Sequence, residues 1–327
     1  MTRLVITELR RLWHRRLVRL VLLGLVCGQL LLAVSMQQDS RPPTPAQQQQ
    51  LAQAYEQARA EWQRSGPQQV AECKAENQRM TEAGNTVYLI DCDSLEPKPS
   101  DYEGRYSVST FIQTLHYVEA VMLLAAAILI GASAVAAEFG AGTVGSWLLV
   151  EPRRNRVYAS KLLAVGLFTL AVGIVSCALA LAGTGLVVRV NHLTNDLTAA
   201  QERALALDLA RTLALATLAS IAAAALAFAT RHTAAVLALV GGYALVSMAW
   251  LTQTPFLGLH NIGLAQHLGA WLDGEYEYVL YRCVAGYSEC TPQTHVMTRP
   301  EAGLWFGLLS LGCILLGWLL FRVRDVT

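Results

Sequence analysis

Charged residues are scarce in this chain. Asp, Glu, Lys and Arg make up 15% of its 327 residues, and 54% of the residues are hydrophobic. Soluble domains carry about 25% charged residues, so this composition excludes an ordinary soluble protein and indicates an integral membrane protein. The formal net charge is only +1, and it is the position of the charges along the chain that carries information.

The sequence also lacks the motifs of the common catalytic sites. It contains no G-x-x-x-x-G-K-S/T phosphate-binding loop, no H-E-x-x-H and no G-x-S-x-G, so we expect neither a nucleotide site nor a hydrolase site. The seven histidines are scattered, and no spacing of His and Cys matches a zinc site. We therefore expect no catalytic residue, no metal and no cofactor bound by this chain.

Long apolar runs divide the chain, and each is long enough to cross a bilayer as a helix that rises about 1.5 Å per residue. The expected fold class is an all-α integral membrane protein with six transmembrane helices. These cover residues 20–36, 111–137, 162–188, 204–230, 233–251 and 303–321. A signal peptide is the alternative for the first run, but its basic flank is long and amphipathic, which favours a retained span.

Residues 1–19 contain six arginines interleaved with apolar residues such as Leu9 and Trp13. This pattern predicts an amphipathic helix that lies along the membrane surface before the first span. A basic arm that binds nucleic acid is the less favoured interpretation, and we expect the lipid bilayer rather than a nucleic acid as the partner of this segment.

Two longer polar segments, 37–110 and 252–302, separate the spans. The first has helical character over 46–62 and is expected to be a small domain or an ordered loop. The second is expected to hold a pair of short re-entrant or interfacial helices over 255–272. Each segment carries two cysteines, and one disulfide in each fits an oxidising compartment. The four candidates are Cys73, Cys92, Cys283 and Cys290.

The basic residues favour one orientation. If the termini and residues 137–161 face the cytoplasm, the inner segments hold 13 Lys or Arg in 52 residues, whereas the outer segments hold 11 in 140. The basic residues are then far denser inside, as the positive-inside rule requires. We expect a multi-pass protein of the plasma (inner) membrane with both termini in the cytoplasm. Segments 37–110 and 252–302 are then extracytoplasmic.

The polar segment 138–161 lies between two long apolar runs and is unusual for a simple connector. Gly142 frees the backbone to turn, and Thr143 fits the N-cap position of a short helix over 144–150. Pro152 disfavours helical geometry at the residue before it and ends the helix there.

This short helix has one apolar face, formed by Val144, Trp147 and Leu148 at positions i, i+3 and i+4. A seven-residue helix is marginal alone in water, so we expect another surface to hold it. The helix either rests on lipid headgroups or docks in a groove of a partner protein. On physical grounds alone the two interpretations are about equally good.

The order of residues in segment 138–161 resembles the cytoplasmic loop of ABC type-2 exporter permeases. An acid, a Gly-Thr pair, leucines, a proline and then basic residues follow one another as they do in that family. Over the rest of the chain, the resemblance extends only to the order and number of spans. It implies that the short helix is a coupling helix that fits a cleft on a separate ATPase subunit. The residues implied in coupling are Glu138, Gly142, Thr143, Val144, Trp147, Leu148, Pro152, Arg154 and Lys161.

The same resemblance implies the partners. ATP and Mg²⁺ would bind the separate ATPase subunit, two permeases would form a dimer, and the substrate would pass between them. The expected function is therefore the transmembrane permease subunit of an ATP-driven exporter, and no span shows a seam that names the substrate. An alternative from another class is a membrane-anchored scaffold or sensor that presents the disulfide-bonded outer segments.

Four polar residues of interest fall inside the expected spans: His116, Glu119, Asp208 and Arg211. An intramembrane acid costs about 2.5–3.5 kcal/mol on insertion scales, so each needs a physical reason. His116 and Glu119 either lie near the interface or pair with each other, and Asp208 and Arg211 are expected to neutralise each other. Contact with an ion or a substrate is the less favoured interpretation for both pairs.

Overall fold

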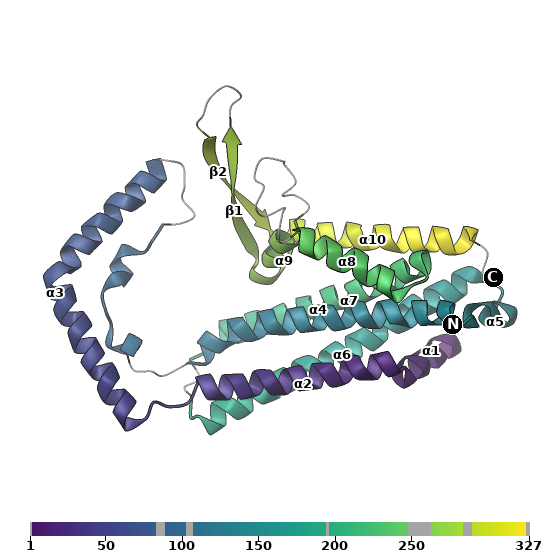
Figure 1. Ribbon diagram of the computed structural model, residues 1–327, viewed down its shortest axis with the longest axis horizontal. Helices are drawn as coiled ribbons and strands as arrows, with labels where there is room; N and C mark the ends of the chain where they lie inside the picture. Colours follow the sequence, from purple (N-terminus) through teal and green to yellow (C-terminus); the bar gives the residue numbers. More distant parts are fainter. Residues whose placement is uncertain are drawn as a thin grey trace.

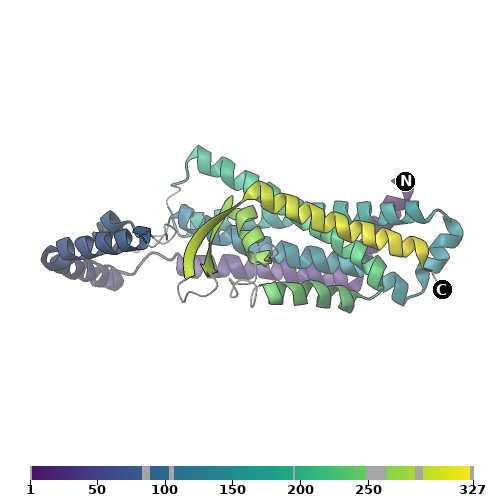
Figure 2. The same cartoon turned by 90° about the horizontal axis from the view of Figure 1, so that it is seen from above.

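The protein is an elongated bundle of helices. The computed structural model describes residues 2–82, 89–102, 107–193, 196–247, 263–283 and 290–324. Both chain termini lie at one end of the bundle, which we name the termini end, and a long helix-bearing arm extends from the opposite end, the arm end (Figures 1 and 2). Helices dominate the described part, as an all-α membrane protein requires.

Five helices in the described part are long and apolar enough to cross a membrane. They are α2 (Arg16–Asp39), α4 (Val108–Gly140), α6 (Arg154–Val190), α7 (Ala199–Thr230) and α10 (Arg299–Val323). The chain is therefore consistent with a multi-pass membrane protein, since each of these runs exceeds the length of about 20 residues that a bilayer demands.

The sixth expected span, 233–251, is present only as the shorter helix α8 (Thr233–Val246). Its fourteen residues fall short of a full crossing, and residues 248–262 lie outside the described part. The tight turn expected at Arg231-His232 is confirmed, because Arg231 adopts a left-handed conformation with φ of 62° at the end of α7. The number of spans thus stays a prediction.

Close approach of the backbones holds the centre of the bundle together. A side chain at Gly131 in α4 would overlap the carbonyl group of Ser220 in α7, and one at Gly317 in α10 would overlap that of Ala225 in α7. Helix α7 can therefore pack tightly between α4 and α10 because each neighbour presents a glycine to it. The fully buried ring of Phe228 fills the remaining space.

The amphipathic helix expected over 1–19 is present as α1 (Thr2–His14). The chain breaks at Arg15, whose backbone is extended, before α2 begins. Three residues of α1 are buried, namely Val5, Glu8 and Leu12, because the helix packs against α6. The inner face of α1 therefore contacts protein, and a carboxylate is among the groups that it buries.

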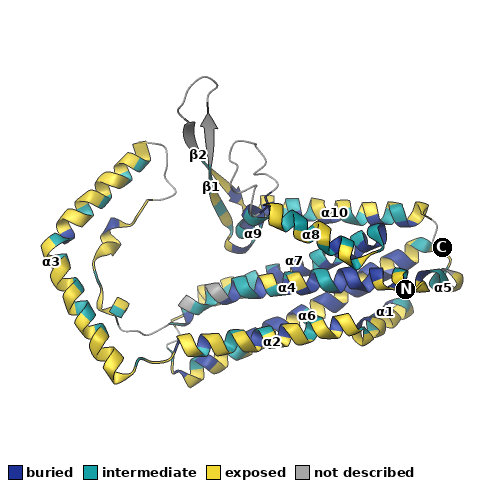
Figure 3. Ribbon diagram, in the orientation of Figure 1, coloured by how far each residue is buried: buried dark blue, intermediate teal, exposed yellow. Residues whose placement is uncertain are grey.

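The first polar segment forms the arm rather than a domain with a core. Its main element is α3 (Pro45–Glu82), a helix of 38 residues whose only buried residue is Gly66. Two short 3-10 helices, η1 (Cys92–Leu95) and η2 (Pro99–Tyr102), lie on the chain that returns to the bundle. Most of the described arm is exposed (Figure 3), so of the two forms expected for this segment, a small domain or an ordered loop, the described residues do not form the domain.

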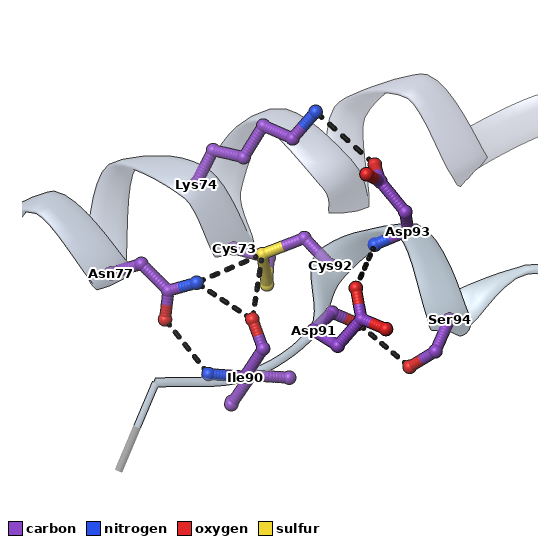
Figure 4. The surroundings of a disulfide bond; sticks show 8 residues. All are labelled: Cys73, Lys74, Asn77, Ile90, Asp91, Cys92, Asp93 and Ser94. Atoms are coloured by element: carbon purple, nitrogen blue, oxygen red, sulfur yellow. Dashed lines mark hydrogen bonds and ion pairs between the residues drawn. A yellow bond between two sulfur atoms is a disulfide. The ribbon is translucent and has the colours of Figure 1, made fainter. Parts of the chain in front are cut away.

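A disulfide fixes the return chain to the arm helix. Cys73 in α3 is bonded to Cys92 in η1, as expected from the sequence. Asn77 strengthens the link, because its side chain donates to the Ile90 carbonyl (2.7 Å) and accepts from the Ile90 amide (3.0 Å) (Figure 4). An exposed ion pair between Lys74 and Asp93 (3.2 Å) flanks the bond.

In its described residues, the second polar segment holds one helix and two antiparallel strands. Helix α9 (Leu264–Asp273) precedes strands β1 (Glu275–Cys283) and β2 (Cys290–Thr298), which pair in antiparallel register. Helix α9 agrees with part of the pair of short helices expected over 255–272, whereas the hairpin was not expected, although the Glu-Tyr-Glu-Tyr alternation has the two-residue period of a strand. Part of the range 255–272 lies outside the described residues.

The second expected disulfide stays a prediction. Cys283 and Cys290 lie directly opposite each other in the β-ladder, a placement that brings two Cβ atoms to about 4.5–5.5 Å. Their side chains lie outside the part of the structure that is described. The three cysteines of the expected spans, Cys27, Cys177 and Cys313, are free thiols.

We expect replacement of both Cys73 and Cys92 by Ser to loosen the arm. The bond closes a loop between residues 19 positions apart. By the chain-entropy estimate, a loop of this length stabilises the folded state by about 3 kcal/mol. The described residues of the arm form no core that could offset this loss. Limited proteolysis of the full chain should cut the variant faster within α3 and the return chain. A reductant should bring the wild type to the same rate, and an unchanged wild-type rate would contradict the prediction.

Candidate functional site

The strongest concentration of buried charge lies at the termini end and is centred on Glu138. This carboxylate sits in the last turn of α4 and is only 5% exposed. The C-terminal end of a helix carries a partial negative charge, so an acid there is unfavourable unless cations compensate it. Arg15 and Lys161 provide that compensation, with N···O distances of 2.6 and 2.5 Å to the two carboxylate oxygens.

Lys161 connects the two acids of this cluster. Its side chain is 3% exposed, and its ammonium group contacts Glu8 at 2.9 Å as well as Glu138. Arg11 lies 3.8 Å from Glu8 and 3.9 Å from Glu138 at the more exposed side. The five residues, two acids and three bases, are named the charge network below. They come from α1, α4 and α6 and from the break before α2, so the network joins four parts of the chain.

The short helix α5 (Thr143–Val150) packs on this network. The turn before it requires the left-handed conformation of Gly142, whose φ is 66°. Trp147 places its ring 4.5 Å from the Arg11 guanidinium and 5.8 Å from the Lys161 ammonium, distances at which cations are attracted to an aromatic face. Val144 is 2% exposed. The helix is therefore held by the protein itself.

Two of the three residues of the expected apolar docking face turn toward the protein. Val144 is buried, and the Trp147 ring faces Arg11 of α1 and Lys161 of α6; the side chain of Leu148 lies outside the described part. Leu149 is instead 88% exposed. The N-cap position is also corrected, since Gly142 occupies it and the Thr143 hydroxyl donates to the Glu138 carbonyl (3.3 Å).

Pro152 and Arg154 connect α5 to α6 and to the last helix. Glu151 is extended, as the residue before a proline should be, and Pro152 is exposed. The guanidinium of Arg154 donates to the carbonyls of Phe321, Arg322 and Arg324 at 2.9–3.1 Å. Arg154 therefore satisfies the free carbonyls at the end of α10 and does not join the charge network.

Of the nine coupling residues implied by the resemblance, the structure brings three side chains together in and on the charge network, Glu138, Trp147 and Lys161, whereas Val144 belongs to the hydrophobic core. Sequence reasoning missed the partners from the N-terminal segment, Glu8, Arg11 and Arg15. A signal was present, because Glu8 is the only acid among the first 19 residues and the two arginines follow it at helical spacing.

His116 and Glu119, two of the polar residues in the expected spans, do not pair with each other. Glu119 is fully buried and does not pair with His116; it accepts a hydrogen bond from Gln29 in α2, which also donates to Ser176 in α6 (3.1 Å). Cys177 lies 3.9 Å from the same carboxylate. Glu119 thus links three apolar helices through hydrogen bonds inside the bundle.

The predicted pair between Asp208 and Arg211 is confirmed, with an N···O distance of 2.6 Å. It has a third member, Arg299 at the start of α10, which lies 3.5 Å from Asp208. The Arg299 guanidinium also donates to the carbonyls of Trp271 and Leu272 in α9 (3.1 Å each). Neutralising only Asp208 and Arg211 would therefore leave Arg299 without its acid.

A cap in trans fixes the start of α4 at the arm end. The amide and hydroxyl of Ser109 donate to the Asp196 carboxylate at 3.0 and 2.6 Å, and Asp196 belongs to the connection between α6 and α7. These hydrogen bonds lower the pKa of Asp196 to about 2, so the carboxylate is ionised at neutral pH. A negative charge at a helix N-terminus is favourable.

Comparisons with known proteins assign no family. No protein-family model, curated protein or solved structure matches this chain. Among the described residues, no group of three or more His, Cys, Asp or Glu is arranged to hold a metal ion. The charge network links α1, α4 and α6 at the termini end by ion pairs, and α5 packs on it through Trp147.

We expect Glu138→Gln to destabilise the protein by about 3–5 kcal/mol, because the change leaves buried cations without their acid. The variant Glu138→Gln with Lys161→Met should recover part of this loss. Thermal unfolding of the purified chain in detergent measures both effects.

Glu151→Gln is the matched control. Glu151 contacts Arg156 only at 3.9 Å, and the arginine side chain is 49% exposed, so the change should cost less than about 1 kcal/mol. Equal melting temperatures for Glu138→Gln and Glu151→Gln would mean that the charge network contributes nothing to stability.

Proposed function

We propose that this chain is the transmembrane permease subunit of an ATP-driven exporter. The observation that carries the proposal is α5, a helix of eight residues that packs through Trp147 on buried ion pairs at the termini end and leaves Leu149 exposed. A helix this short has little stability alone. One that is fixed to three neighbouring helices can transmit force to them.

In this proposal, a separate ATPase subunit binds ATP and Mg²⁺ and pushes α5 when it closes. Trp147 passes the movement to Arg11 and Lys161, and the buried pair of Lys161 with Glu138 passes it to α4 and α6. Two permeases form the transport unit, and the substrate moves between them. The residues of this chain hold α5 in position and link it rigidly to α4 and α6, whereas the hydrolysis of ATP takes place on the partner.

The docking surface that we propose differs from the face expected from the sequence. The exposed residues in and directly after α5 include Leu149, Pro152, Arg153 and Arg156. An exposed leucine beside basic side chains suits a cleft with an apolar floor and an acidic rim. Val144 and Trp147 act behind this surface and hold the helix in place.

The proposed location is the plasma (inner) membrane with both termini in the cytoplasm. The asymmetry of basic residues supports it, and so does the position of both termini beside α5 at one end of the bundle (Figure 1). The disulfide-bonded arm then lies outside the cell, where a disulfide persists.

One observation favours the alternative of a scaffold or sensor. The arm extends well beyond the bundle with α3 exposed along its length (Figures 2 and 3), which suits a surface for an external partner. A scaffold, however, has no need of a short helix fixed by buried charges at the opposite end. ATP hydrolysis separates the two hypotheses, because only the permease requires an ATPase.

We expect the full chain alone to hydrolyse no ATP, and the chain purified from its native membranes to carry a P-loop ATPase subunit. Leu149→Glu should lower the amount of that subunit at least about tenfold, since it places an acid in an apolar contact. Co-purification and ATPase activity in reconstituted vesicles are the measurements.

Leu95→Glu, at a 39% exposed leucine on the arm, should change neither quantity. If no ATPase accompanies the wild type, the permease hypothesis is wrong. If Leu149→Glu retains both the subunit and its activity, α5 is not the docking element.

A further inference from the structure

A cavity of about 260 Å³ lies at the arm end, remote from the charge network. Helices α4, α7 and α9 contribute its main side chains. Ile112, Leu205 and Leu272 are apolar lining residues, and the polar ones include His116, Asp208 and Asp273. Apolar walls with a few convergent polar groups are the usual composition of a small-molecule site.

His116 is the polar group that the fold leaves unexplained. Its side chain lines the cavity and the residue is only 7% exposed, yet neither ring nitrogen has a hydrogen-bond partner among the described residues. A buried polar group without a partner is costly and calls for a specific explanation. A neutral imidazole offers one donor and one acceptor, so a ligand in the cavity can satisfy it.

The charges around the cavity leave one carboxylate uncompensated. Asp208 is neutralised by Arg211 and Arg299 at 2.6 and 3.5 Å. Asp273 forms no ion pair with any described residue and accepts a hydrogen bond from the Tyr117 hydroxyl. It is exposed, so it stands where the cavity meets solvent. A positively charged group placed there gains attraction without displacing an existing cation.

We propose that this cavity binds a small amphiphilic ammonium compound. The apolar body contacts Ile112, Leu205 and Leu272, the ammonium group lies near Asp273, and the ligand satisfies a ring nitrogen of His116. Hydrogen bonds of an ammonium to carboxylate and imidazole acceptors are among the stronger ones in proteins. The ligand enters from the solvent at the arm end, and the site is independent of the proposed coupling to an ATPase.

The experiment uses three probes of equal length and different charge. Binding of n-hexylammonium, hexan-1-ol and hexanoate to the purified full chain is measured at pH 7 by calorimetry, with protein-free detergent titrations subtracted. The ammonium should bind at least about tenfold more tightly than either other probe, since one charge-assisted contact is worth that much. Equal affinities for the three probes would overturn the proposal, because ordinary partition into an apolar space would then suffice.

Two variants separate binding from structure. Asp273→Asn should abolish the preference for the ammonium, whereas Glu277→Gln, at an exposed acid of β1 that does not line the cavity, should preserve it. His116→Leu removes a buried group without partners, so it should raise the melting temperature while it weakens hexylammonium binding at least about fivefold. Unchanged affinity in His116→Leu, or an ammonium preference retained in Asp273→Asn, would contradict the proposal.

Discussion

A buried carboxylate at the C-terminal end of a helix determines how the segments at the termini end pack together. Glu138 sits where the α4 dipole is negative, in a place almost without solvent. Removing such a charge from water costs several kcal/mol, and only close cations and further hydrogen bonds offset that cost. Lys161 from α6 and Arg15 from the break after α1 meet the requirement. The packing of four chain segments thus depends on the compensation of one acid.

The same constraint explains why α5 exists. Its sequence cannot sustain a free helix of eight residues, but the cations gathered around Glu138 present a surface on which Trp147 packs. At the other end of the bundle, the long arm is held by the Cys73–Cys92 bond rather than by a core. One end is therefore stiffened by buried charge, and the other by a covalent link outside the bundle.

Sequence patterns predicted most of the helices because apolar runs and their polar interruptions are local features. The amphipathic α1, the turn at Arg231 and the Cys73–Cys92 disulfide were all foreseeable in this way. The direction in which Trp147 faces was not foreseeable, since it depends on the contact of its ring with Arg11, a residue more than a hundred positions away in the sequence. Pairings such as Gln29 with Glu119 are equally non-local. The hairpin was missed although its alternating pattern is local.

The account rests on α5 being held rigidly by the charge network. Hydrogen–deuterium exchange of a peptide covering residues 143–151, followed in the full chain in lipid nanodiscs, tests this most directly. The account predicts slow exchange in the wild type and fast exchange in Glu138→Gln, because a free helix of this length opens readily. Fast exchange of this peptide in the wild type would show that the network does not hold α5 and would contradict the account.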